Sequence, residues 1–162
     1  MKKTLLALLA LLCTPFALRA DTLYVTPTGA GTRDGSDWAN AFAGIQAAVD
    51  AADAAYAADY TLHDILVTNG VYTPVLVSRN FALQVRSVNG AAETVIDGGG
   101  TNWCVRLGAN ATLKNVAVVN GSHPQSSWYD YAGGVTGGWV GKLWFTNVHL
   151  GEVTRTITLV VE

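Results

Sequence analysis

Short apolar segments alternate with tight polar breaks between residues 94 and 121. The apolar segments are residues 94–96, 104–107 and 113–119, and the breaks between them are rich in Gly and Asn. Gly and Asn tolerate the positive φ of sharp corners, and the Gly run and β-branched residues disfavour a helix. Strands this short cannot bury a face alone. The pattern therefore predicts a parallel β-solenoid, in which each coil covers the apolar face of the previous one.

A weak repeat after Asp64 agrees with a solenoid. Asn-Gly pairs recur at Asn69, Asn89 and Asn120, and residues 113–118 resemble residues 145–150, 32 positions later. A solenoid would give this region about three or four coils of roughly 20 to 30 residues each. Asn-Gly is also a hairpin turn, so an antiparallel sandwich is the alternative, although matched strands beside two-residue turns are absent.

The region before Asp64 predicts a strand followed by a helix. Residues 22–26 alternate like a strand and end at Pro27. We expect the helix over about residues 38–56, starting after Ser36 or Asp37, and residues 51–60 either continue it or fray. Its apolar positions at helical spacing are Trp38, Phe42, Ile45, Val49 and Ala52. In a solenoid such a helix would cover the open end of the first coil, with its first three apolar side chains as the plug.

The order of these motifs resembles the beginning of secreted bacterial right-handed parallel β-helix proteins of the pectin-lyase-like fold. Trp38-Ala39-Asn40-Ala41, Gly70-Val71-Tyr72 and Thr94-Val95-Ile96-Asp97-Gly98 carry the likeness, which covers residues 22–122. The resemblance implies an all-β, right-handed parallel β-helix (solenoid) with an N-terminal amphipathic capping helix. It implies no particular activity, because members of this fold differ widely in what they do.

The chain then divides into four expected parts. They are a signal peptide (residues 1–20), an N-terminal strand with its capping helix (21–60), parallel β-helix coils (61–150) and a strand-like tail (151–162). The tail alternates and then runs apolar without a polar final coil. It fits either a fragment of a longer β-helix or an edge strand that folds back.

The first twenty residues have the pattern of a secretory signal. Lys2 and Lys3 precede an unbroken run of Leu and Ala at residues 5–12, and Pro15 and Ala20 follow it. We expect cleavage near Ala20 and a secreted, extracellular or cell-surface protein. An uncleaved anchor would need about 20 apolar residues, more than this run offers. A lipid anchor on Cys13 is a further alternative, which the preceding Leu12 disfavours.

Removal of the leader leaves seven basic and twelve acidic residues, a net charge of about −5. No basic run remains, so we expect no nucleic-acid binding. We also expect no stable membrane span once the leader is cleaved. Cys104 is then the one cysteine, which excludes an intrachain disulfide. Its position in an alternating segment predicts a buried structural thiol and not a nucleophile.

Charged residues are sparse in the predicted coils. Some proteins of this fold cleave acidic polysaccharides, and that chemistry needs several charged groups that converge from neighbouring coils. Arg86 and Arg106 are expected on one solvent-facing column without an acidic partner, and Lys114 is expected to be solvated. The nearby carboxylates are Asp64, Glu93, Asp97, Asp130 and Glu152. No catalytic set emerges from these residues.

Three other groups of residues predict structural roles. We expect Asp97 to bind the backbone of its Gly-rich corner, and Asp34 and Asp37 to act in a turn and a cap and not as calcium ligands. His123 and His149 lack neighbours at metal-ligand spacing. We therefore expect neither a metal nor a cofactor.

One aromatic cluster, in the long loop after Gly121, is the candidate ligand site. Its residues are Trp128, Tyr129, Asp130 and Tyr131. Aromatic rings beside a carboxylate suit sugars, although packing of the loop on the solenoid explains them equally well. The sequence predicts a non-catalytic secreted or cell-surface protein, scaffold or adhesin-like, with polysaccharide as the candidate partner. The alternative is a polysaccharide lyase or glycoside hydrolase of the same fold.

Overall fold

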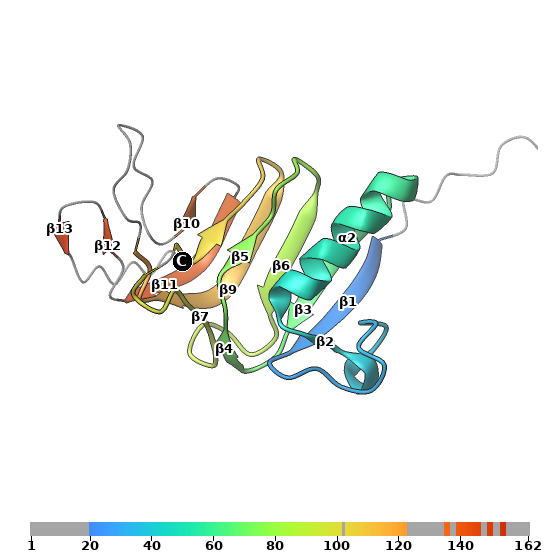
Figure 1. The fold of residues 1–162 in the computed structure, drawn as a ribbon, viewed down its shortest axis with the longest axis horizontal. Helices are drawn as coiled ribbons and strands as arrows, with labels where there is room; N and C mark the ends of the chain where they lie inside the picture. Colours follow the sequence, from blue (N-terminus) through green and yellow to red (C-terminus); the bar gives the residue numbers. More distant parts are fainter. Residues whose placement is uncertain are drawn as a thin grey trace, which may run out of the picture.

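The computed structural model describes residues 20–101 and 103–122, together with the backbone of residues 135–136, 139–146, 149–150 and 153–154. The predicted signal peptide up to residue 19 and the aromatic cluster at Trp128, Tyr129, Asp130 and Tyr131 lie outside the described residues. Figure 1 shows mostly strands, with one α-helix lying across one end of them. The chain is therefore largely β.

The described elements follow one another along the chain. In order they are β1 (Ala20–Thr26), the 3₁₀ turn η1 (Trp38–Asn40), β2 (Phe42–Ala43), α2 (Ile45–Asp59), β3 (Leu62–Val67), β4 (Gly70–Tyr72), β5 (Val75–Leu76), β6 (Leu83–Ser87), β7 (Thr94–Asp97), β8 (Val105–Arg106), β9 (Ala111–Val119), β10 (Val135–Thr136), β11 (Trp139–Thr146), β12 (His149–Leu150) and β13 (Val153–Thr154).

Parallel pairing joins most of these strands. The large sheet has the order β2-β1-β3-β6-β9-β7-β4, and β11 also pairs with β9. A second sheet has the order β10-β8-β5, and its pairs are parallel too. Among the described pairs, β12 with β13 is the single antiparallel one. The antiparallel sandwich that we kept as an alternative is therefore wrong for this part of the chain.

The register joins residues that are far apart in the sequence. His63 pairs with Leu83, Leu83 with Ala111, and Val75 with Val105. The separation along the chain within each of these pairs agrees with the coil length expected from the sequence. Strand β9 belongs to two rows of strands, because its first residues pair with β6 and its last three with β7.

Alternation along the strands sorts side chains between an inner and an outer side. In β3, His63, Ile65 and Val67 are buried, whereas the residues between them are partly exposed. Strand β6 alternates in the same way. Partners in register therefore form buried rows, such as Ile65, Val85 and Leu113. Each such side chain contributes about 1.5–3 kcal/mol through its burial.

The corners explain why the expected repeat is only partly right. Asn69 and Asn89 follow β3 and β6, and Asn89 Nδ2 donates to Asn69 Oδ1 at 2.6 Å. In β9 the corresponding bend falls at Asn115, which has φ of 57°. Asn120 instead follows the second half of β9 and donates to Asp97 Oδ1 at 3.0 Å. The third Asn-Gly pair thus occupies a different corner from the first two.

The likeness between residues 113–118 and 145–150 is also wrong as a guide to pairing. Val140 pairs with Leu113 and Phe145 with Val118, so the paired residues are closer in sequence than the similar ones. Connections differ in length from corner to corner, because loops absorb added residues more easily than strands do. The number of residues between two paired positions therefore changes from coil to coil, even though the strands pair in the same parallel way.

The helix begins later than the pattern predicts. Residues 38–40 form η1, and β2 pairs with residues 25–26 of β1 before the chain turns at Gly44, which has φ of 85°. Asp37 caps η1 and not α2, since its Oδ1 accepts from Asn40 N at 2.8 Å. Residues 51–59 continue the helix, and Tyr60 ends it in the left-handed conformation.

Helix α2 covers the inner side of the first strands (Figure 1). Its buried residues are Ile45, Ala48, Val49 and Ala52, which confirms the apolar face from Ile45 onward. Trp38 does not plug the end as expected, because it is 40% exposed, while Phe42 is partly buried against the core.

Polar and aromatic contacts fix the helix to the strands beside it. The edge of β5 is closed by Gln46, whose Oε1 accepts from Leu76 N at 2.8 Å and whose Nε2 donates to Leu76 O at 3.1 Å. Further along the helix, Tyr56 stacks on Phe81 with ring centroids 5.1 Å apart. This end of the stack is therefore covered.

No helix within the described part of the chain is long and apolar enough to cross a membrane.

Candidate functional site

Polar side chains gather on the outer side of the large sheet, where β3, β6 and β9 run side by side. Asp64 is the register partner of Gln84, and Arg86 is the register partner of Lys114. All four residues alternate with buried neighbours, so their side chains lie on the outer side. Adjacent strands are about 4.8 Å apart, which brings these side chains within contact distance. We call these four residues the outer row.

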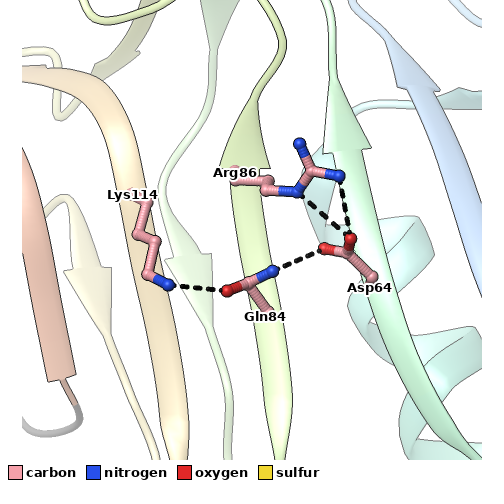
Figure 2. Close-up of polar contacts among 4 residues, drawn as sticks. All are labelled: Asp64, Gln84, Arg86 and Lys114. Atoms are coloured by element: carbon pink, nitrogen blue, oxygen red, sulfur yellow. Dashed lines mark hydrogen bonds and ion pairs between the residues drawn. The ribbon is translucent and has the colours of Figure 1, made fainter. Parts of the chain in front are cut away.

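The side chains of the outer row form one connected network (Figure 2). Arg86 Nε donates to Asp64 Oδ2 at 3.1 Å, and Arg86 Nη2 lies 3.1 Å from the same oxygen as an ion pair. Gln84 Nε2 donates to Asp64 Oδ1 at 3.2 Å, and Lys114 Nζ donates to Gln84 Oε1 at 2.8 Å. Both oxygens of the one carboxylate are thereby engaged.

Charge in the outer row is not balanced. Asp64 pairs with Arg86, whereas the contact of Lys114 is to a neutral amide oxygen. The second terminal nitrogen of Arg86 points away from Asp64 in Figure 2. The row therefore keeps a net positive charge and has N–H groups directed to solvent.

This arrangement suits binding better than bond cleavage. The side chains of Arg86 and Asp64 are 40% and 25% exposed, so solvent screens their attraction and the pair adds only about 0–1 kcal/mol to stability. Hydrolysis of a glycosidic bond requires two carboxyl groups that flank the substrate. The outer row holds one carboxylate, already bonded on both oxygens.

An aromatic pair lies at the β1 end of the same face. Tyr24 is the register partner of Leu66, which in turn pairs with Arg86. Trp38 meets the Tyr24 ring edge-on, with centroids 4.7 Å apart and planes at 71°. The line from Tyr24 through Leu66 and Arg86 to Lys114 thus runs from aromatic to cationic.

The expectation for the two arginines is wrong. Arg106 lies on β8 in the second sheet, where it pairs with Leu76 and its guanidinium stands 5.7 Å from the Trp103 ring centre. Arg86 lies on the large sheet and has the acidic partner Asp64. Strand pairing and register decide on which sheet each arginine lies and which residue it contacts. Neither can be read from the sequence of one strand.

The structural roles expected for the isolated acidic residues are confirmed. Asp97 Oδ1 accepts from Gly99 N at 2.8 Å within the Gly-rich corner. Asp34 accepts from Thr32 Oγ1 at 2.7 Å and from Ser36 N at 3.0 Å, and these hydrogen bonds lower its pKa to about 2. No group of three or more potential metal ligands occurs among the residues that the structure describes.

Cys104 is a buried structural thiol, as predicted. Its Sγ donates to Val119 O at 3.1 Å, and burial raises its pKa to about 11. A thiol with such a pKa is a poor nucleophile near neutral pH.

Sequence reasoning missed the outer row because it weighed charged residues one at a time. Aligning the buried Ile65 with the buried Val85, as the pairing does, would have placed Asp64 beside Gln84 and Leu66 beside Arg86. The alternation of both segments was visible, but the offset between them was not tied to a register.

Fold and outer row together define a largely β protein with parallel sheets, one covering helix and a solvent-facing polar network. No protein-family model matches the chain, and the searches of curated proteins and of solved structures give no significant match.

Proposed function

We propose that the chain forms a right-handed parallel β-helix and acts as a non-catalytic secreted or cell-surface scaffold of the adhesin-like kind. The register is the observation that carries this proposal. Segments about one coil apart in the sequence pair in parallel in three rows of strands, represented by β3 with β6, β4 with β7, and β5 with β8. Parallel crossovers of this kind are right-handed in about 98% of cases.

A non-catalytic role is supported by how the charged side chains are used. Asp64 is bonded to Arg86 and Gln84, Asp97 to its own corner, and Arg106 lies against Trp103. Asp97, Arg106 and Lys114, which could have formed a cleft, belong to different rows of strands. Their separation favours a scaffold over a lyase or hydrolase.

Export is supported by the leader pattern of the first twenty residues. Mass spectrometry of the protein recovered from the medium or cell surface tests this part. We expect an N-terminus at or near Asp21, and a secreted chain that still starts at Met1 would contradict it.

The functional class is tested by incubating the whole protein with acidic and neutral polysaccharides, with and without calcium. We expect retention on some of them and no change in polymer length. Shortening of a polymer that is lost in the Lys114→Gln variant would overturn the non-catalytic assignment.

A further inference from the structure

We propose that the outer row and its aromatic end bind a polysaccharide that carries oxyanions, lying across the strands. Trp38 and Tyr24 would contact sugar rings, and Arg86 and Lys114 would contact the oxyanions. This inference rests on the proposed function, which leaves the polymer intact, and it places binding on the large sheet instead of the loop at residues 128–131.

Charge complementarity selects the sign of the ligand. The chain after its predicted leader has a net charge of about −5, yet the outer row combines two cations with one carboxylate. Asp64 compensates Arg86 at 3.1 Å, whereas among the residues that the structure describes Lys114 has no acidic partner. A local positive charge on a negatively charged protein favours an anion at that place. The global charge disfavours nucleic acid, which is far more densely charged.

The geometry selects an extended ligand. Tyr24, Leu66, Arg86 and Lys114 are successive register partners on β1, β3, β6 and β9. With about 4.8 Å between strands, the line from Tyr24 to Lys114 is about 14 Å long. A linear polymer lying along this line would reach both ends, whereas a single small anion would reach only one.

The aromatic end favours a sugar over a peptide. Trp38 is 40% exposed and is held by its edge-on contact with Tyr24. A ring fixed in this way loses little conformational freedom on binding and offers an apolar face to the C–H side of a sugar. Gln84 adds an amide whose oxygen has a second lone pair for a hydroxyl.

The test uses the full-length protein and three soluble probes with one backbone. They are cello-oligosaccharides, the same chains oxidised to carboxylates at C6, and the same chains sulfated. At low salt we expect both charged probes to bind more tightly than the neutral parent, and added salt to remove the difference. Equal affinity for all three probes, or no binding of any, would overturn the proposal.

Five variants, one of them a control, locate the site. Lys114→Gln should weaken binding of the charged probes about two- to fivefold and leave the neutral probe unchanged. Asp64→Asn frees Arg86 from its carboxylate and should strengthen binding of the charged probes by a similar factor. Trp38→Ala should lower the affinity for all three probes about two- to tenfold, and Trp38→Phe should restore most of that affinity. Arg106→Gln is the matched control, since it removes a cation from the other sheet and should change nothing.

If Lys114→Gln and Arg106→Gln lowered the affinity for the charged probes equally, the probes would be attracted to the charge of the whole surface. That result would contradict the proposed site. Shortening of a probe by the wild-type protein would instead contradict the non-catalytic function. The binding comparison among variants would still stand in that case, so the two failures are distinguishable.

Discussion

The two sides of the large sheet are made by the same strands and have opposite characters. Inside, Ile65, Val85 and Leu113 are register partners and are almost fully buried. Outside, one position along each strand, Leu66, Arg86 and Lys114 are register partners and are partly exposed. A shift of a single residue would exchange the two sets.

The inner residues of the large sheet stabilise the fold, whereas its outer residues are available for binding. Inner residues are surrounded by other apolar side chains and gain free energy from burial. Outer residues form hydrogen bonds that water could replace, so they contribute little to stability and are free to contact a ligand. Substitutions on the two sides should therefore differ sharply in stability and in binding.

The largest expected effect is on the inner side. Ile65→Ala removes a fully buried side chain next to helix α2 and should lower the free energy of unfolding by about 2–5 kcal/mol. Leu66→Ala, one residue along on the outer side, is the matched control and should cost much less. Urea unfolding followed by circular dichroism measures both. Equal losses would mean that the two sides are not distinct.

The next largest expected effect is a loss of stability at alkaline pH, caused by ionisation of Cys104. Burial raises the pKa of this thiol to about 11, above the ordinary value of 9.0. The folded chain therefore holds the proton more tightly than the unfolded chain. The free energy of unfolding should then fall by about 2–3 kcal/mol as the pH rises from about 9 to 11.

Cys104→Ala should reduce this pH dependence, although Tyr72, whose pKa burial also raises, leaves a part of it. Urea unfolding of both proteins at a series of pH values between 8 and 11 makes the comparison. An identical decline in wild type and variant would show that the thiol is not linked to folding.

The edge that α2 closes should show an intermediate effect. Gln46→Ala removes both hydrogen bonds to Leu76 and should cost about 1–2 kcal/mol. It should also increase self-association, because the edge of β5 becomes available to another strand. Thermal unfolding and light scattering report the two consequences, with Gln84→Ala, a partly exposed position away from the β5 edge, as a control that should leave scattering unchanged.

The smallest expected effect is on the outer row. Arg86→Gln breaks the solvent-screened pair with Asp64 and should change the free energy of unfolding by no more than about 1 kcal/mol. A loss of several kcal/mol would mean that the outer row is part of the structural framework.

Local patterns predicted much of this fold. The short strands around residues 94–119, the turn at Asp34, the corner at Asp97 and the buried Cys104 depend on neighbours close in sequence or on alternation, and all are found. The helix start was wrong because β2 pairs with β1, a contact that overrides helical spacing at Phe42.

The outer row depends on register, which the sequence alone did not provide. Asp64 meets Arg86 only because Ile65 aligns with Val85, and the corner lengths that set this alignment vary along the chain. The predicted binding residues Trp128, Tyr129, Asp130 and Tyr131 lie outside the described residues and stay a prediction.

Disulfide trapping across the large sheet tests the register most directly. In a chain with Cys13 and Cys104 replaced by Ala, we expect Gln84→Cys with Thr112→Cys to form a disulfide readily. These residues are register partners on adjacent parallel strands, about 4.8 Å apart. Arg86→Cys with Thr112→Cys, offset along the strand to about 8 Å, should not bridge. Efficient bridging of the offset pair, or none in the first pair, would contradict the parallel register on which the outer row depends.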